Sequence, residues 1–295
     1  MVKVTIGVLS YKRTKDLVSL LTDLITISVE CRLVIVNNDP ELDIYQYVEF
    51  VKCNKFIDLV YLNPGKNLGV AGGRNLILDQ AVGEYTILFD DDLHIPDINL
   101  ILSTCSNIFK KSEYGGIAFN VKDFHSGGYS RYEIPHANKK VDMNSEFDTY
   151  LMIGAGHALK NDFFKKNGGY PSDFGLYGME EIDLSFKLIS KGKRIKYHPN
   201  LVVHHKKSPV GRLPQDDVML RLFINKSKIA KRYFPYINYL TTLTVWGAVY
   251  LIKTRQLIKF FRAVRSVASY RTDDTDRISE SGLGYIRGVS GRLWF

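Results

Sequence analysis

The first ninety residues alternate short apolar runs with amphipathic stretches, and this alternation constrains the fold more than any other feature of the sequence. Four apolar runs have the length and composition of β-strands: Val2–Leu9, Arg32–Val36, Leu59–Leu62 and Tyr85–Phe89. Helical spacing is present in 15–27, and again in 70–81 after a glycine-rich turn. Strands that alternate with helices form βαβ units, so we expect an α/β fold with a mostly parallel sheet flanked by helices.

Later segments continue the same pattern and then change character. The expected elements are a helix from Pro96 to Lys111, a strand 115–121, a helix 180–191 that Gly192 ends, and a strand 195–203. The polar segment 122–144 has no clear period and is expected to form a loop over a site. Basic and aromatic helical patterns follow Pro209. We therefore predict two parts, a catalytic domain over residues 1–210 and a helical C-terminal region over residues 211–295.

The net charge of +9 is concentrated in the C-terminal region. Residues 206–271 contain fourteen lysines and arginines against two acidic residues. An apolar run, 237–252, lies between basic segments and is shorter than the roughly 20 residues that a spanning helix needs. We expect this region to make peripheral contact with an anionic membrane surface rather than with nucleic acid. A solvated helical subdomain is the alternative.

The three cysteines are odd in number and widely spaced, which argues against a disulfide framework and fits a reducing compartment. The first apolar run has no cleavage pattern of a signal peptide. We therefore expect a cytoplasmic protein that lies at the inner face of the membrane.

Three adjacent carboxylates, Asp90, Asp91 and Asp92, follow the apolar run Tyr85–Phe89 directly. Ligands of open α/β sheets bind just outside the carboxyl ends of the strands. Adjacent carboxylates repel one another, and a hard divalent cation removes this repulsion. A turn that caps the next helix is the alternative, but a cap needs one aspartate and not three.

Two further groups could complete such a site. Glu180, Glu181 and Asp183 open the helix 180–191, where they either complement the helix dipole or supply a general base. His204 and His205 end a strand, and side chains of successive strand residues point to opposite faces, so one of the two can face the site. The segment 63–75, NPGKNLGVAGGRN, offers glycines, backbone amides and two cations for phosphate, or is a plain tight turn.

In their order along the chain, these pieces resemble family-two glycosyltransferases with the GT-A fold. The resemblance covers roughly residues 3–210. It rests on the segments LSYKR, VIVNNDP, NLGVAGGRN, FDDD, GAGHAL, YGMEEIDLSFKL and YHPNLVVHH. The ordered set is far more specific than any single motif. The resemblance extends to bacterial rhamnosyl- and galactosyl-type transferases of surface polysaccharide synthesis.

Carried over by position, the resemblance implies a role for each matching residue. The donor-binding residues are expected to be Ser10, Tyr11, Arg13, Asn37, Asp39, Lys66, Asn67, Gly69, Arg74, Asp90 and Asp91. Asp90, Asp92 and His205 are expected to hold a divalent metal, with His204 as the alternative. Glu181 stands at the place of the catalytic base, with Glu180 and Asp183 as alternates. Asn37 replaces an acidic residue found in many members, which leaves the nucleotide base open.

The implied activity is an inverting, metal-dependent hexosyl transfer from a nucleotide-diphosphate sugar to a saccharide or lipid-linked saccharide. UDP is the favoured nucleotide and dTDP-rhamnose the alternative donor, while manganese is favoured over magnesium. A sugar nucleotidyltransferase is a competing interpretation, but Ser10 to Lys15 lacks the glycines that such an enzyme has after its first strand. A non-catalytic donor-binding or scaffold subunit is the alternative from a different class.

Overall fold

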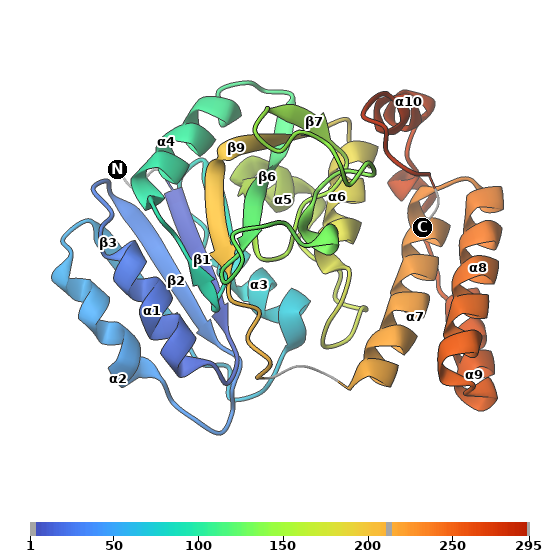
Figure 1. The fold of residues 1–295 in the computed structure, drawn as a ribbon, viewed down its shortest axis with the longest axis horizontal. Helices are drawn as coiled ribbons and strands as arrows, with labels where there is room; N and C mark the ends of the chain where they lie inside the picture. The colour runs from blue at the N-terminus through green and yellow to red at the C-terminus, as the bar shows by residue number, and fades with distance from the viewer. Residues whose placement is uncertain (1–3, 211–213, 294–295) are drawn as a thin grey trace.

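One nine-stranded sheet organises the molecule, with the strand order β3-β2-β1-β4-β8-β6-β9-β5 and β7 paired to β9 (Figure 1). The computed structural model describes residues 4–210 and 214–293. The strands that run in one direction are β1 Val4–Ser10, β2 Cys31–Asn37, β3 Ile57–Leu62, β4 Tyr85–Asp90, β6 Tyr114–Asp123 and β9 Arg194–His205. Those that run in the opposite direction are β5 Leu93–His94, β7 Phe147–Thr149 and β8 Gly156–Lys160.

The expected α/β fold is confirmed, with one refinement of the sheet. Strand β8 inserts antiparallel between β4 and β6, and no strand was expected there because its sequence, GHALK, contains two polar residues among five. The first residues of the strand expected at 2–9 lie outside the described part of the chain. Because β4 and β9 still run in the same direction, both carboxyl ends reach the same edge of the sheet.

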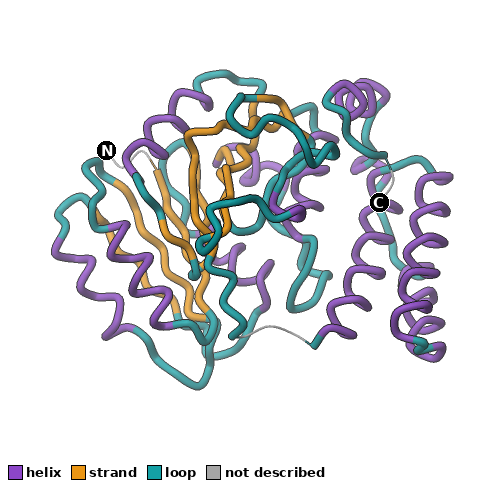
Figure 2. Tube along the Cα trace, in the orientation of Figure 1, coloured by secondary structure: helices purple, strands orange, loops and turns teal. Residues whose placement is uncertain are grey.

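Helices cover both faces of the sheet, as Figure 2 shows. One face is covered by α1 Thr14–Leu24, the short α2 Tyr45–Val48 and α4 Ile98–Phe109, and the other by α3 Gly69–Asp79, α5 Asn161–Asn167 and α6 Glu180–Ser190. Short 3-10 turns lie at Glu49–Cys53 and Arg131–Glu133. Alternating residues of β2 serve the two faces, with Leu33 in one apolar cluster and Val34 in the other.

Local sequence explains where the helices begin and end. Helix α1 buries four leucines along one stripe, and each buried leucine contributes about 1.5–3 kcal/mol. Helix α4 begins after Asp97, whose side chain accepts a hydrogen bond from Leu100 N at 2.9 Å, so Pro96 lies before the cap and not in the first turn. Helix α6 ends before Gly192, which adopts a φ of +75°.

The C-terminal region is helical, as expected, and packs on the sheet domain. It contains α7 Gln215–Tyr233, α8 Tyr236–Thr254, α9 Leu257–Ala268, a 3-10 turn Asp274–Asp276 and α10 Glu280–Gly288. One apolar cluster joins Leu184 and Phe186 of α6 to Ile229 and Tyr233 of α7. The division into two domains at residue 210 remains a prediction. Within the described residues, no helix is both long and apolar enough to span a bilayer.

Candidate active site

The acidic run at the end of β4 divides its three carboxylates between two environments. Asp90 ends β4, and Asp91 and Asp92 form the turn that leads into β5. Asp91 is buried and accepts hydrogen bonds from Tyr11 N at 3.0 Å and from Arg13 Nη1 at 3.1 Å. Burial raises the pKa of Asp91 to about 7, although Arg13 opposes the shift. Asp91 therefore holds the loop after β1 in place. To contact a donor, as the sequence predicted, Asp91 would have to give up its hydrogen bonds from Tyr11 and Arg13.

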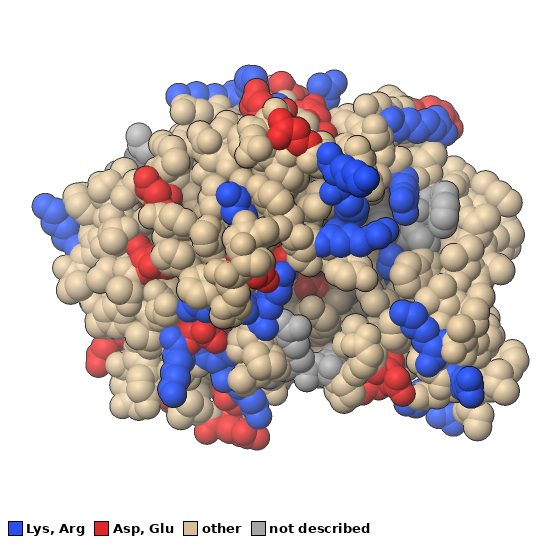
Figure 3. Space-filling model, viewed as in Figure 1, with Lys and Arg blue, Asp and Glu red and all other residues tan. Residues whose placement is uncertain are grey.

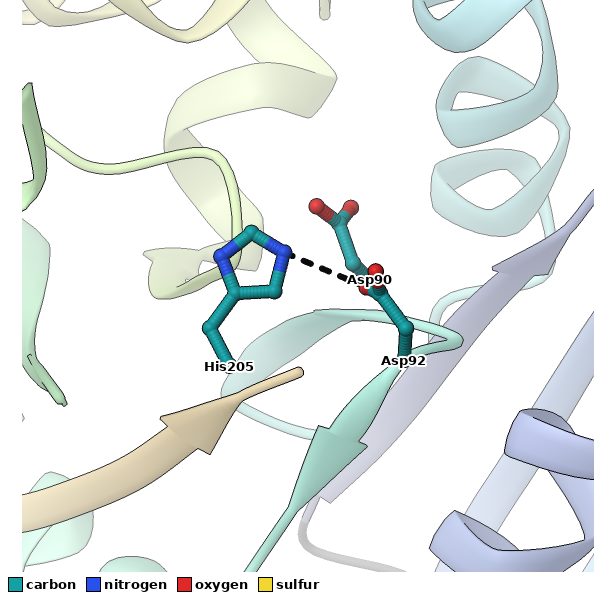
Figure 4. A group of neighbouring side chains, drawn as sticks. All are labelled: Asp90, Asp92 and His205. Carbon is teal, nitrogen blue, oxygen red and sulfur yellow. Dashed lines mark ion pairs between the residues drawn. The ribbon is translucent and has the colours of Figure 1, made fainter. Parts of the chain in front are cut away.

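Asp90, Asp92 and His205 converge at this edge of the sheet (Figure 4). One potential ligand atom from each lies within 4.8 Å of the others. The pairing of β5 with β9 sets Leu93 opposite His205, which brings His205 Nε2 to 3.3 Å from Asp92 Oδ1. Two carboxylates and an imidazole can bind a divalent metal ion, and we call Asp90, Asp92 and His205 the metal group.

The chemistry of this group fits a cation. Asp92 is fully buried, and its Oδ1 accepts no well-oriented hydrogen bond from the described residues, although His205 Nε2 lies close. Burial alone would lower the pKa of His205, but the carboxylates of Asp92 and Glu133 raise it to about 10. A cation would replace that proton and satisfy the unpaired oxygen.

Glu133 contacts the ring nitrogen of His205 that does not face Asp92. Its Oε1 lies 2.5 Å from His205 Nδ1, which leaves Nε2 directed towards Asp92. Carboxylate partners of this kind fix the orientation of metal-binding histidines and increase their basicity. Glu133 comes from the segment 122–144, which was expected only to cover the site. A lone glutamate in a segment without period gives no sequence signal for this role.

His204 points to the other side of β9. Its ring lies edge-on to that of His94, with 5.7 Å between ring centroids, and His94 Nδ1 lies 3.0 Å from Asp23 Oδ2. The structure therefore brings His205, and not His204, to the two aspartates, and the two histidines point to opposite faces as successive residues of a strand do.

Arg13 connects the metal group to the chain that follows β9. Its Nη1 also lies 3.2 Å from Asp92 Oδ2, and its Nε donates to Val210 O at 2.9 Å. The same Asp92 oxygen accepts a hydrogen bond from Ser208 N at 2.9 Å. Ser208 and Val210 were not expected near the site. Ser208 contacts Asp92 directly, and Val210 contacts it through Arg13.

Arg74 lies behind Asp90 and is itself buried, with 2% of its surface exposed. Its Nη2 donates to Asp90 Oδ1 and to Gly154 O, both at 2.8 Å, and its guanidinium lies 5.6 Å from the centre of the Tyr170 ring. Tyr170 in turn contacts the fully buried His157, whose Nε2 lies 2.5 Å from the Tyr170 hydroxyl. Burial lowers the pKa of His157 to about 3, so the ring stays neutral. Arg74, Tyr170 and His157 thus form a connected buried group that holds Asp90 in place. Neither His157 nor Tyr170 was identified from the sequence.

The loop after β2 is shaped by its own polar side chains. Ser10 and Asn37 lie opposite each other in the sheet and are both buried. Asn37 Nδ2 donates to Leu42 O at 2.7 Å, and its Oδ1 accepts from Asp39 N at 3.0 Å. Asp39 accepts from Glu41 N at 3.1 Å. These residues build a fixed loop at the carboxyl edge of the sheet.

The glycine-rich segment begins α3 and packs against the chain that leads to α6. Lys66 is exposed, and Asn67 Oδ1 accepts a hydrogen bond from Gly69 N at 2.8 Å. Gly69 adopts a φ of +72°, and a β-carbon there would come within 2.7 Å of Leu176 Cα. Glycine is therefore required at residue 69, where the backbone of Gly175 and Leu176 passes close by.

The second acidic run is held at the start of α6. Met179, just before it, adopts a left-handed backbone conformation with a φ of +73°, which costs about 1–3 kcal/mol for such a residue. Glu180 is buried, accepts from Gly178 N at 2.8 Å and lies 3.6 Å from Arg74 Nη1. A β-carbon at Gly154 would lie 3.5 Å from Glu181 Cδ and 3.7 Å from Arg74 Nη2. Glu180 and Glu181 are thus both brought towards Arg74 and Asp90.

Burial, and next the charge of Glu180, raise the pKa of Glu181 above that of an exposed glutamate. Asp183 has a different setting, because it lies on the side of α6 that faces α7. Its Oδ1 lies 2.6 Å from Arg232 Nη1, and its Oδ2 accepts from the Tyr233 hydroxyl at 3.2 Å. The structure does not bring Asp183 to the metal group.

The chain is similar in sequence to a known family and to one curated protein. The family model "Glycosyl transferase family 2" matches residues 5–160. A Haemophilus influenzae protein described as uncharacterized is 36% identical over 141 residues, which are 47% of this chain and 76% of that protein.

Solved structures share the fold at low sequence identity. A mannosyltransferase from Pyrobaculum calidifontis, in complex with GDP-Man and Mn2+, has a TM-score of 0.60 at 15% identity, over 98% of this chain and 79% of that chain. S. aureus TarS in complex with UDP-GlcNAc has a TM-score of 0.63 at 16% identity, over 90% of this chain and 80% of that chain. The family match covers more than half of the sequence, and the chain therefore belongs to glycosyl transferase family 2.

Proposed function

We propose that this chain is a metal-dependent, inverting glycosyltransferase that transfers a hexosyl group from a nucleotide-diphosphate sugar. The observation that carries the proposal is the convergence of Asp90, Asp92 and His205 beside a buried Arg74, with the carboxyl of Glu181 close to the same arginine. A metal-assisted displacement needs a cation site, a positive charge that holds its ligands, and a base on an element other than those of the ligands. Side chains for all three are present here, with the carboxylate base on helix α6.

The residues of the chain have separate tasks in the proposed reaction. Asp90, Asp92 and His205 would hold the cation, which when bound neutralises the charge on the departing diphosphate. Glu181 accepts the proton of the acceptor hydroxyl while the hydroxyl oxygen bonds to the anomeric carbon. The bond from that carbon to the diphosphate breaks in the same step, so the configuration inverts. Arg74 holds Asp90 in place, and Glu133 holds His205.

The raised pKa of Glu181 suits a general base. A base that titrates closer to neutral pH takes a proton from a hydroxyl more readily than an ordinary carboxylate does. The negative charge of Glu180 contributes to that shift, and Arg74 opposes it. Glu180 remains the alternate base, because it lies on the same side of α6.

The donor is proposed to be a UDP-sugar, with dTDP-rhamnose as the alternative. Two of the structural neighbours are complexes with UDP-GlcNAc and with UDP, GalNAc and Mn2+, while another contains GDP-Man and Mn2+. We favour manganese over magnesium because an imidazole joins the two carboxylates. Lys66, Asn67 and the loop 37–39 lie around the same edge and are the proposed contacts to the nucleotide.

We propose a saccharide or lipid-linked saccharide as the acceptor, at the cytoplasmic face of a membrane in surface polysaccharide synthesis. The support is the resemblance to bacterial transferases of that process and the basic C-terminal region. A sugar nucleotidyltransferase is disfavoured by the family match. A donor-binding subunit without catalysis would share the metal group, and the test must separate it from the transferase.

A thermal-shift panel tests the proposal. The purified chain is heated with UDP, dTDP, GDP or CMP, each with manganese or with a chelator. A nucleotide at about a hundred times its dissociation constant adds roughly 2.7 kcal/mol, which is easily seen. Stabilisation by one diphosphate that requires manganese supports the proposal and names the donor class. Donor hydrolysis that Glu181→Gln abolishes, while nucleotide binding remains, separates the enzyme from a scaffold.

A further inference from the structure

The turn between α8 and α9 presents apolar side chains outward. Ile252, Leu257, Ile258 and Phe261 are exposed to 76%, 61%, 71% and 66%. The last three lie on one side of α9, because Leu257 and Ile258 precede Phe261 by four and three residues. The opposite side of α9 buries Ala263 and Val267, so the helix is already packed and these outward residues form a second apolar face.

Basic side chains surround these apolar residues. Lys253, Arg255, Lys259 and Arg262 are exposed, and none has an ion-pair partner within the described ranges of the chain. Figure 3 shows Lys and Arg side chains grouped at the lower right of the molecule, over the ends of α8 and α9. We call the eight residues 252, 253, 255, 257, 258, 259, 261 and 262 the α8–α9 tip.

The backbone of the α8–α9 tip is fixed. Arg255 adopts a left-handed conformation with a φ of +55° and its N–H donates to Leu251 O at 2.8 Å, which closes α8. The side chain of Gln256 donates to Asp216 of α7 at 2.8 Å. Phe260, next to the exposed residues, stacks on Phe223 of α7 with 5.7 Å between ring centroids. The apolar residues are therefore held outward and cannot turn into the core.

We infer that the α8–α9 tip docks on an anionic phospholipid surface. Its four apolar side chains enter the boundary between headgroups and acyl chains, and its four cations contact the headgroups. A second copy of the chain would bring like charges together in a two-fold contact, whereas anionic lipid complements both the charge and the apolar residues. This inference rests on the proposed function, in which the acceptor is a membrane-borne saccharide.

Packed helices connect the α8–α9 tip to the active site. Helices α8 and α9 share an apolar cluster with α7 through Met219, Phe223, Tyr250 and Ala263. Helix α7 in turn pairs with α6, the helix of Glu181, through Arg232. When the tip is docked, these helices hold the active site in a fixed orientation relative to the membrane. A lipid-linked acceptor would reach the active site from that membrane.

Vesicle co-sedimentation tests the inference with the full chain. The wild type is expected to bind vesicles of phosphatidylcholine with phosphatidylglycerol, and to bind pure phosphatidylcholine weakly. Ile258→Asp with Phe261→Asp is expected to weaken binding at least about tenfold. About 1 M salt, with a screening length of about 3 Å, is expected to weaken it as well. The matched comparison is Phe261→Asp alone against Val29→Asp, because each adds one negative charge. Val29 is 47% exposed in the loop between α1 and β2, and its variant should bind as the wild type does.

The inference is overturned if the wild type does not bind anionic vesicles, if the tip variant binds as well as the wild type, or if the Val29→Asp control loses binding equally. A concentration-dependent dimer in light scattering that Phe261→Asp dissolves would assign the tip to self-association instead. The nucleotide-dependent thermal shift is measured on the same variants. If that shift is absent while vesicle binding persists, the proposed function fails and the docking surface stands.

Discussion

The two acidic runs, Asp90–Asp92 and Glu180–Asp183, look alike in the sequence but use their carboxylates differently. In the turn after β4, the two outer aspartates face the site and the middle one is buried against Tyr11 and Arg13. In the first turn of α6, the two leading glutamates face Arg74, whereas Asp183 faces α7. In each run one carboxylate stabilises the fold and the others are available for chemistry. Backbone geometry decides which one, because a turn and a helix direct successive side chains differently.

The largest effect is expected at Asp92, one of the two outer aspartates of the first run. Asp92→Asn is expected to reduce transfer at least about 1,000-fold, because the variant loses an ionised ligand of the cation. His204→Asn, one residue from His205 but on the opposite side of β9, should retain transfer within about twofold. Initial rates at saturating manganese provide the measurement. Equal losses in the two variants would mean that the metal group is assigned wrongly.

A second test removes the proposed base. Glu181→Gln is expected to lower kcat about 100- to 1,000-fold while leaving the affinity for nucleotide with manganese unchanged, since the side chain acts on the acceptor proton. Single-turnover rates and nucleotide titrations separate the two effects. Full turnover in this variant would remove Glu181 from the mechanism and point to Glu180.

The carboxylates assigned to the fold should instead affect stability. Asp183→Asn leaves the guanidinium of Arg232 with a weakened partner in a buried setting, so a loss of about 3 kcal/mol in the free energy of unfolding is expected. Asp91→Asn should cost less, because Arg13 keeps its contact with Asp92. Urea unfolding measures both. If Asp183→Asn abolished transfer at unchanged stability, Asp183 would have to belong to the site.

The smallest expected effect is on the pH dependence of transfer, which tests whether the charge of Glu180 raises the pKa of Glu181 in α6. Glu181 must be ionised to act, so the rate should rise with pH through its raised pKa. Glu180→Gln removes a negative charge that contributes to this shift, and the acid limb should therefore move to lower pH. Rates are recorded at saturating manganese so that metal binding does not limit them. An acid limb that stays in place or moves to higher pH would contradict the coupling.

Much of this arrangement could be predicted from local sequence. The strands β1 to β4 followed from apolar runs, and the position of Asp90 and Asp92 followed from the end of such a run. Strand alternation predicted that one of two histidines would face the aspartates, without deciding which. These features depend on neighbouring residues, and their periods are visible in the sequence.

The contacts that were missed join residues far apart in the chain. Arg13 reaches Asp91 across 78 residues, Arg232 reaches Asp183 across 49, and Glu133 reaches His205 across 72. None of these partners has a sequence pattern that indicates the other. The inserted strand β8 was missed for a related reason, because its buried His157 becomes acceptable in the core only when Tyr170 and the Ile153 carbonyl are in place.

The most direct test of the central claim is calorimetric titration of the nucleotide diphosphate selected by the thermal-shift panel. The titration compares the wild type, Glu181→Gln and Asp92→Asn, each with manganese and with a chelator. We predict that the first two bind with the same Kd within about twofold in manganese, and that neither binds in chelator. Asp92→Asn should show no binding in either condition. Metal-independent binding by the wild type, or wild-type affinity in Asp92→Asn, would contradict the assignment of Asp90, Asp92 and His205 as the metal site.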